Sequence, residues 1–174
     1  ASSSPNTIHA VAKASARMQF LATTVALSKE CSMHTEHFGV TLSALRNLLS
    51  NIDNIVAVGT TSVRTLESLS ALAWRIKCCG DAECERVIGQ WELYDIPAEF
   101  GGREALHTLI EYMEQRELTQ MKAATQIMIT PLGYRFRIVR YIITNFHQPK
   151  STLLLLVSAL LFVQTLKDNL ISVR

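Results

Sequence analysis

A short polar segment near the end of the chain carries its densest set of chemically useful side chains. Residues 144–152 hold two amides, one imidazole, one ammonium and three hydroxyls beside one proline; these are Thr144, Asn145, His147, Gln148, Pro149, Lys150, Ser151 and Thr152. Such groups can bind a substrate, exchange protons and neutralise phosphate, whereas most surface loops are polar without this density. We therefore expect a functional site at this segment.

The polar segment lies between a predicted strand and a predicted helix. The apolar pair Ile142-Ile143 precedes it, and Pro149 disfavours helical structure at the residue before it. Ser151 or Thr152 can cap a helix that continues through residues 153–166, which are apolar on nearly every side and therefore predict a central, buried helix. A strand end followed by a helix start is the place where alternating strand-and-helix proteins bind ligands.

A second strand-turn-helix unit is predicted at residues 54–76. The apolar run 54–58 is typical of a strand buried on both faces, and it ends at Gly59. The free amides at the start of the following helix, with the hydroxyls of Thr60 and Thr61 and the cation of Arg64, could bind a carboxylate or a phosphate. The alternative is an ordinary crossover helix in which Arg64 pairs with Glu67 or Ser68. If the two strands are parallel, both units share one edge of the sheet.

Two further segments carry possible site residues. His34 and Glu36 are two residues apart, which would place both side chains on one face of a strand and suits acid/base chemistry, but equally suits a solvated strand edge. Residues 127–138 predict a β-hairpin whose outward side chains include Arg135 and Arg137. With Arg140 and Lys150 they could form a phosphate-binding stripe, or simply a solvated strand face.

The composition sets limits on the class of protein. A chain of 174 residues with 48% hydrophobic and 18% charged residues fits one globular domain, and a net charge of +2 neither requires nor excludes a nucleic-acid partner. The longest apolar stretch, residues 153–163, is too short for a bilayer span, so we expect no membrane association. The N-terminus lacks the features of a signal peptide, which leads us to expect a cytoplasmic protein.

The four cysteines predict free thiols rather than a disulfide framework or a metal site. Cys78 and Cys79 are adjacent, and the spacing to Cys84 contains no C-x-x-C pair and no histidine at zinc-site distance. We therefore expect no metal ion. The chain begins with a serine-rich stretch and without methionine, which we interpret as a fragment of something longer.

Several ordered stretches together resemble the S-adenosylmethionine:tRNA ribosyltransferase-isomerase family of queuosine biosynthesis. They are residues 33–36 (Met-His-Thr-Glu), residues 55–68 (Ile-Val-Ala-Val-Gly-Thr-Thr-Ser-Val-Arg-Thr-Leu-Glu-Ser) and residues 143–158. Residues 90–92 and 125–134 are also similar to the family. The resemblance covers roughly residues 33–159 and is more specific than any single short motif.

The resemblance implies an α/β fold and a particular reaction. The family has a three-layer α/β domain, with a central mixed or parallel sheet and helices on both faces, interrupted by a small β-barrel that is absent from this chain. Residues 33–174 look like the C-terminal share of that domain, and residues 1–32 look like a divergent or incomplete N-terminal segment of it. The family transfers the ribosyl group of S-adenosylmethionine to the 7-aminomethyl-7-deazaguanine wobble base of tRNA and isomerises it to give epoxyqueuosine. Adenine and methionine are released.

The resemblance also suggests roles for the residues named above. The catalytic candidates are His34, Glu36 and His147; the substrate-binding candidates are Gly59, Thr60, Thr61, Arg64, Asn145 and Lys150; the tRNA-binding candidates are Arg135 and Arg137. S-adenosylmethionine is the ribosyl-donating substrate, tRNA is the partner, and we expect a monomer.

The sequence departs from the family pattern in ways that bear on activity. Residues 20–29 contain no glycine where the family carries a glycine-rich turn, Arg140 replaces a usual acidic residue, and Leu132 lengthens the turn between Pro131 and Gly133. We therefore predict that the 174 residues alone are inactive. A non-catalytic tRNA-binding remnant is the alternative; a methyltransferase would need a glycine-rich nucleotide turn, and only Gly59 is present in that position.

Overall fold

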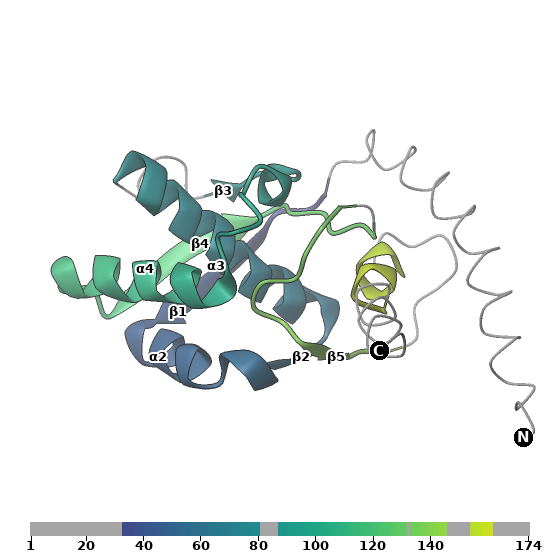
Figure 1. Ribbon diagram of the computed structural model, residues 1–174, viewed down its shortest axis with the longest axis horizontal. Coiled ribbons are helices and arrows are strands. Elements are labelled where there is room, and N and C mark those ends of the chain that lie inside the picture. The colour runs from purple at the N-terminus through teal and green to yellow at the C-terminus, as the bar shows by residue number, and fades with distance from the viewer. Residues whose placement is uncertain (1–32, 81–86, 132, 146–153, 162–174) are drawn as a thin grey trace, which may run out of the picture. The chain divides into compact units, whose positions relative to one another are not determined.

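The computed structural model describes residues 33–80, 87–131, 133–145 and 154–161 (Figure 1). All of them lie in the second of two compact units, Met33–Arg174. The elements in chain order are β1 (Glu36–Thr41), α2 (Leu42–Ser50), the 3-10 turn η1 (Ile52–Asn54), β2 (Val56–Val58), α3 (Thr60–Cys79), β3 (Val87–Ile88), the 3-10 turn η2 (Glu92–Tyr94), α4 (Gly102–Gln115), β4 (Gln120–Thr125) and β5 (Tyr141–Ile143). Residues 154–161 are helical as well.

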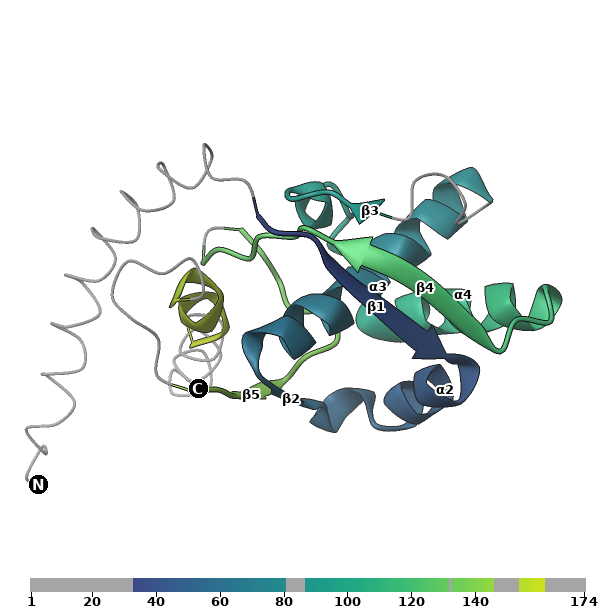
Figure 2. The ribbon, with the colours of Figure 1, turned by 180° about the vertical axis from the view of Figure 1, so that it is seen from behind.

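The described strands form two sheets. β4 lies between β1, with which it is antiparallel, and β3, with which it is parallel; β2 and β5 form a separate parallel pair. Figures 1 and 2 show α3 and α4 together on one face of the three-stranded sheet. The predicted α/β class, with mixed and parallel strand pairing, is confirmed.

The helices form where local sequence signals favour them. The Thr41 hydroxyl caps α2 by accepting a hydrogen bond from the Ala44 amide at 3.2 Å. Helix α3 ends at Gly80, whose left-handed conformation allows its amide to bond the Ile76 carbonyl. Helix α4 buries an apolar face that contains Leu106, Leu109, Ile110 and Met113. Within the described residues, no helix is long and apolar enough to cross a membrane.

The predicted hairpin at residues 127–138 is wrong. β4 ends at Thr125, and the described residues between it and β5 contain no strand. The backbone amides of Arg137, Ile138 and Val139 donate to the carboxylate of Glu67 on α3 instead of to a neighbouring strand. A buried side chain thus replaces the partner strand that a hairpin would provide.

The prediction that residues 54–58 are buried on both faces is also wrong. Ala57 is buried, but Val56 and Val58 are 49% and 67% exposed. In the described residues β2 pairs only with β5, so one face packs inward and the other remains open. Tyr141 and Ile143, which are in register with Val56 and Val58, are exposed on β5 in the same way.

Candidate functional site

The two predicted strand ends meet at one edge of the parallel pair. Val58 and Ile143 are in register at the carboxyl ends of β2 and β5, and the Gly59 amide donates to the Ile143 carbonyl at 2.7 Å. Gly59 has φ +85°, a backbone conformation that residues with a side chain rarely adopt, so a glycine is needed at this turn. The start of α3 and the exposed Asn145 therefore lie at the same edge, as the sequence predicted. His147 and Lys150 lie outside the described residues.

The first turn of α3 has hydrogen-bond donors at this edge. Gly59 precedes the helix and provides no side-chain cap for the first amides. Thr60 is buried, whereas Thr61 is exposed, and the Ser62 hydroxyl turns back to the Val58 carbonyl at 2.6 Å. Within the described residues no side chain caps this 20-residue helix, so its first turn offers backbone amides and the positive end of its dipole, which favour an anionic group.

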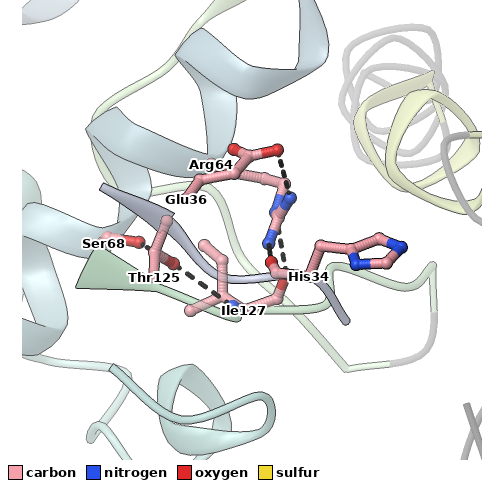
Figure 3. Close-up of polar contacts among 6 residues, drawn as sticks. All are labelled: His34, Glu36, Arg64, Ser68, Thr125 and Ile127. Carbon is pink, nitrogen blue, oxygen red and sulfur yellow. Dashed lines mark hydrogen bonds and ion pairs between the residues drawn. The ribbon is translucent and has the colours of Figure 1, made fainter. Parts of the chain in front are cut away.

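Arg64, one turn into α3, lies at the centre of a buried polar cluster (Figure 3). It is 3% exposed and donates to Glu36 Oε1 at 2.8 Å, to the Ile127 carbonyl at 3.0 Å and to the His34 carbonyl at 3.3 Å. Burial lowers the pKa of Arg64, and the neighbouring Glu36 carboxylate opposes that change. The local pairing of Arg64 with Glu67 or Ser68 that the sequence left open is replaced by this long-range ion pair.

The two carboxylate oxygens of Glu36 differ in their hydrogen bonding. Its Oε1 accepts from Arg64, while its Oε2 is buried and has no hydrogen-bond partner in the described structure. An unpaired buried acceptor is costly, so such an atom is a natural position for a donor on a ligand. The arrangement fixes Glu36 in place and leaves it able to accept a hydrogen bond or a proton.

His34 and Glu36 do not share a strand face in the way the spacing predicted. Strand β1 begins at Glu36, so His34 lies just outside it, and Figure 3 shows the imidazole pointing away from the Glu36 carboxylate. The His34 carbonyl, not its ring, joins the Arg64 cluster. The ring is exposed and lies apart from the ion pair.

Glu67 is a buried site residue that the sequence reasoning missed. It is 0% exposed, and its carboxylate accepts a hydrogen bond from the Tyr134 hydroxyl. The same carboxylate accepts from three consecutive backbone amides, those of Arg137, Ile138 and Val139, at distances of 2.7–3.0 Å. Its position in the sequence could have indicated this role, because Glu67 lies four residues after Val63 and four before Ala71 and so places a carboxylate on an apolar helix face. Glu67 fixes the chain that leads into β5 and therefore to Asn145.

The two predicted tRNA-binding arginines occupy different environments. Arg135 is exposed, whereas Arg137 is partly buried and donates to the carbonyls of Ile96 at 2.9 Å and Phe100 at 3.2 Å. Its guanidinium also lies over the ring of Tyr134, 5.7 Å from the centroid. They do not form an outward stripe on a strand, because the segment that carries them is not a strand.

The described residues contain no group of three histidine, cysteine, aspartate or glutamate side chains that could hold a metal ion. Cys78 and Cys79, at the end of α3, are exposed free thiols. Neither lies among the residues of the Arg64 cluster.

Comparisons with known proteins agree in pointing to one family. A family model described as "Queuosine biosynthesis protein" matches residues 8–170. An S-adenosylmethionine:tRNA ribosyltransferase-isomerase of Burkholderia lata is 34% identical over 141 residues, which are 79% of this chain and 29% of that protein. The enzyme of the same name from Cupriavidus metallidurans is 34% identical over 142 residues, which are 80% of this chain and 28% of that protein.

A solved structure is similar as well. The crystal structure of S-adenosylmethionine tRNA ribosyltransferase from Thermotoga maritima is 26% identical and matches with a TM-score of 0.41, covering 77% of this chain and 34% of that one. The chain thus spans under a third of the length of the curated relatives named here.

Proposed function

Because the chain belongs to the queuosine biosynthesis protein family, we propose that it forms part of the substrate site of an S-adenosylmethionine:tRNA ribosyltransferase-isomerase. The reaction would transfer the ribosyl group of S-adenosylmethionine to the 7-aminomethyl-7-deazaguanine wobble base of tRNA and isomerise it to epoxyqueuosine. Adenine and methionine would leave. The site of action would be the cytoplasm, where the tRNA substrate is available.

The observation that carries this proposal is the Arg64–Glu36 pair beside the start of α3. Arg64 holds one Glu36 oxygen at 2.8 Å, and the buried Oε2 has no partner. The reaction needs a group that removes a proton, from carbon beside the sulfonium or from the attacking ammonium, and a fixed carboxylate with a free acceptor suits either step. We assign Glu36 this role and Arg64 the role of positioning it.

The free amides of the α3 start suit the carboxylate of the methionine moiety. At the turn that Gly59 forms, Thr60 and Thr61 would bind it through their backbone amides and the exposed Thr61 hydroxyl, because anions are favoured at a helix N-terminus without a side-chain cap. Asn145, at the same sheet edge, would orient the ribose. His34 and His147 would exchange protons with departing adenine, and Lys150 would neutralise tRNA phosphate.

The test is adenine release from S-adenosylmethionine, with unmodified tRNA present, by a full-length relative in which these residues replace the matching segment. Glu36→Gln keeps the size of the side chain but removes its basicity, so we expect the rate to fall about 100-fold or more. Glu114→Gln removes an exposed carboxylate paired with Arg46 and serves as the matched control, with an unchanged rate expected. An unchanged rate in Glu36→Gln would remove Glu36 from the catalytic assignment.

A non-catalytic tRNA-binding remnant is the second candidate, favoured by the exposed Arg135 and by Arg137, whose guanidinium is fixed by two backbone carbonyls. Separate titrations of the 174-residue chain with S-adenosylmethionine and with unmodified tRNA discriminate the two. Binding of tRNA without binding of S-adenosylmethionine would support the remnant. Binding of S-adenosylmethionine that is lost in Arg64→Gln would support the catalytic site.

A further inference from the structure

A recess that neither Arg64 nor Glu36 lines lies between the chain that enters α4 and the segment that precedes β5. It has a volume of about 480 Å³, and three arginines contribute to its wall: Arg135, Arg137 and Arg140. Tyr94 and Phe136 provide aromatic surface, and none of the lining residues is acidic. A recess with this composition is electropositive and suits an anionic ligand.

The charge of Arg137 is held in place without being neutralised by an ion pair. Its guanidinium donates to the carbonyls of Ile96 and Phe100, which are neutral acceptors. Its Nη1 is buried without an acceptor, and among the described residues no carboxylate lies within ion-pair distance. Arg137 is therefore a fixed cation whose positive field extends into the recess.

The start of α4 contributes to the same wall. Gly101 and Gly102 line the recess, and Gly101 provides no side-chain cap for this 14-residue helix. A Cβ on Gly102 would lie 2.1 Å from the Arg137 carbonyl oxygen, so a glycine is needed for the arginine-bearing segment to approach the helix. This close approach brings the helix start and the arginines to one recess, and the helix dipole adds to their positive potential.

We propose that this recess binds a phosphate group carried on a nucleotide, and that the tRNA backbone is the source of that phosphate. The identity of the RNA rests on the proposed function, whereas the phosphate chemistry rests on the recess alone. Arg135, which is exposed at the rim, would form the outer contact, and Arg137 would supply a preorganised charge behind it. A single phosphate held in this recess replaces the surface stripe that the sequence analysis considered.

The test is a titration of the ¹⁵N-labelled 174-residue chain, followed by NMR at low salt. The probes are inorganic phosphate, adenosine 5′-monophosphate, adenosine and a short single-stranded RNA. We expect the amides of Gly101, Gly102 and Gly133 and the Nε–H of Arg137 to shift saturably with every probe except adenosine. RNA binding tighter than that of the mononucleotide would identify the RNA backbone as the source; the reverse order would identify a free nucleotide. Absence of saturable shifts at these residues with all phosphate probes would overturn the proposal.

Two variants separate the recess from a general charge effect. Arg135→Gln removes an exposed cation and should weaken phosphate binding about tenfold, in line with the loss of one charge-assisted contact. Gly101→Leu fills open space at the recess, because a Cβ there meets no atom within 4 Å, and should abolish the shifts in a folded chain. The control Arg46→Gln, on α2, should bind as the unsubstituted chain does. Equal weakening by Arg46→Gln and Arg135→Gln would overturn the site.

Phosphate binding is measured by NMR without any catalytic turnover, so it tests the recess separately from the catalytic assignment of Glu36. Glu36→Gln should leave phosphate binding unchanged, because Glu36 is not among the residues that line the recess. If the catalytic assignment is wrong, Glu36→Gln will leave adenine release unaltered while phosphate still binds to the recess. If the recess is wrong, the phosphate probes will cause no saturable shifts while adenine release still depends on Glu36.

Discussion

Glu67 determines the path of the chain between β4 and β5. Its carboxylate is fully buried and accepts from Tyr134 and three backbone amides. Glu67→Gln replaces an acceptor oxygen with an amide nitrogen that faces donors, so we expect the free energy of unfolding to fall by about 2–4 kcal/mol. Urea unfolding followed by circular dichroism measures this loss. Glu114→Gln, which removes an exposed ion pair, should cost no more than about 1 kcal/mol; equal effects of the two variants would contradict the role of Glu67.

Tyr134 gives the same cluster a dependence on alkaline pH. Burial, together with the neighbouring Glu67 carboxylate, raises the pKa of Tyr134 well above its ordinary value. Above pH of about 10 the unfolded chain releases this proton while the folded chain retains it, so stability is full below that pH and is lost as pH rises. We expect the free energy of unfolding to decline above pH of about 10, by up to about 1.4 kcal/mol per pH unit from this group. Tyr134→Phe should reduce the slope and Tyr141→Phe, at an exposed site, should not; identical slopes would exclude Tyr134 as the cause.

At the scale of elements, the packing of α4 on the segment before β5 depends on Gly102. A methyl group there would meet the Arg137 carbonyl at 2.1 Å, and backbone cannot move aside as a flexible side chain can. We expect Gly102→Ala to destabilise the fold by about 2 kcal/mol or more, by overpacking. Gly101→Ala, at φ −81° and in open space, is the matched control and should leave the thermal midpoint within a few degrees. A tolerated Gly102→Ala would show that α4 can shift.

The elements that the sequence predicted well are those with local signals. Helix α3 follows from the apolar run that ends at Gly59 and the helix start predicted after it, and the shared edge of β2 and β5 follows from where two apolar runs end. The hairpin failed because its donors go to Glu67, about 70 residues earlier in the chain. The ion-pair partner of Arg64 could not be predicted either, because Glu36 is 28 residues away in the chain and no local sequence pattern joins the two. Such pairings are decided by tertiary structure, which spacing along the chain does not encode.

At the scale of the whole molecule, the parallel pair β2–β5 has one face that the described residues leave exposed. Val56, Val58, Tyr141 and Ile143 are 49–67% exposed, whereas strands of parallel sheets are ordinarily covered on both faces. The curated relatives named above are more than three times as long as the segment that matches this chain.

The last prediction concerns the edge that holds Gly59 and Asn145: the 174-residue chain by itself releases no adenine from S-adenosylmethionine. A ribosyl transfer requires the sulfonium donor and the wobble base to be held together in one orientation, and loss of that positioning removes a large share of catalysis. The described residues offer the helix start and Asn145 along one edge and Glu36 paired with Arg64 of the same helix, while phosphate binding at the α4 recess needs only residues that the structure already brings together. We therefore expect the chain to bind phosphate and to release no adenine above the rate without protein, under conditions in which a full-length relative is active. Adenine release that depends on the chain and is lost in Glu36→Gln would refute this prediction and show that one edge suffices.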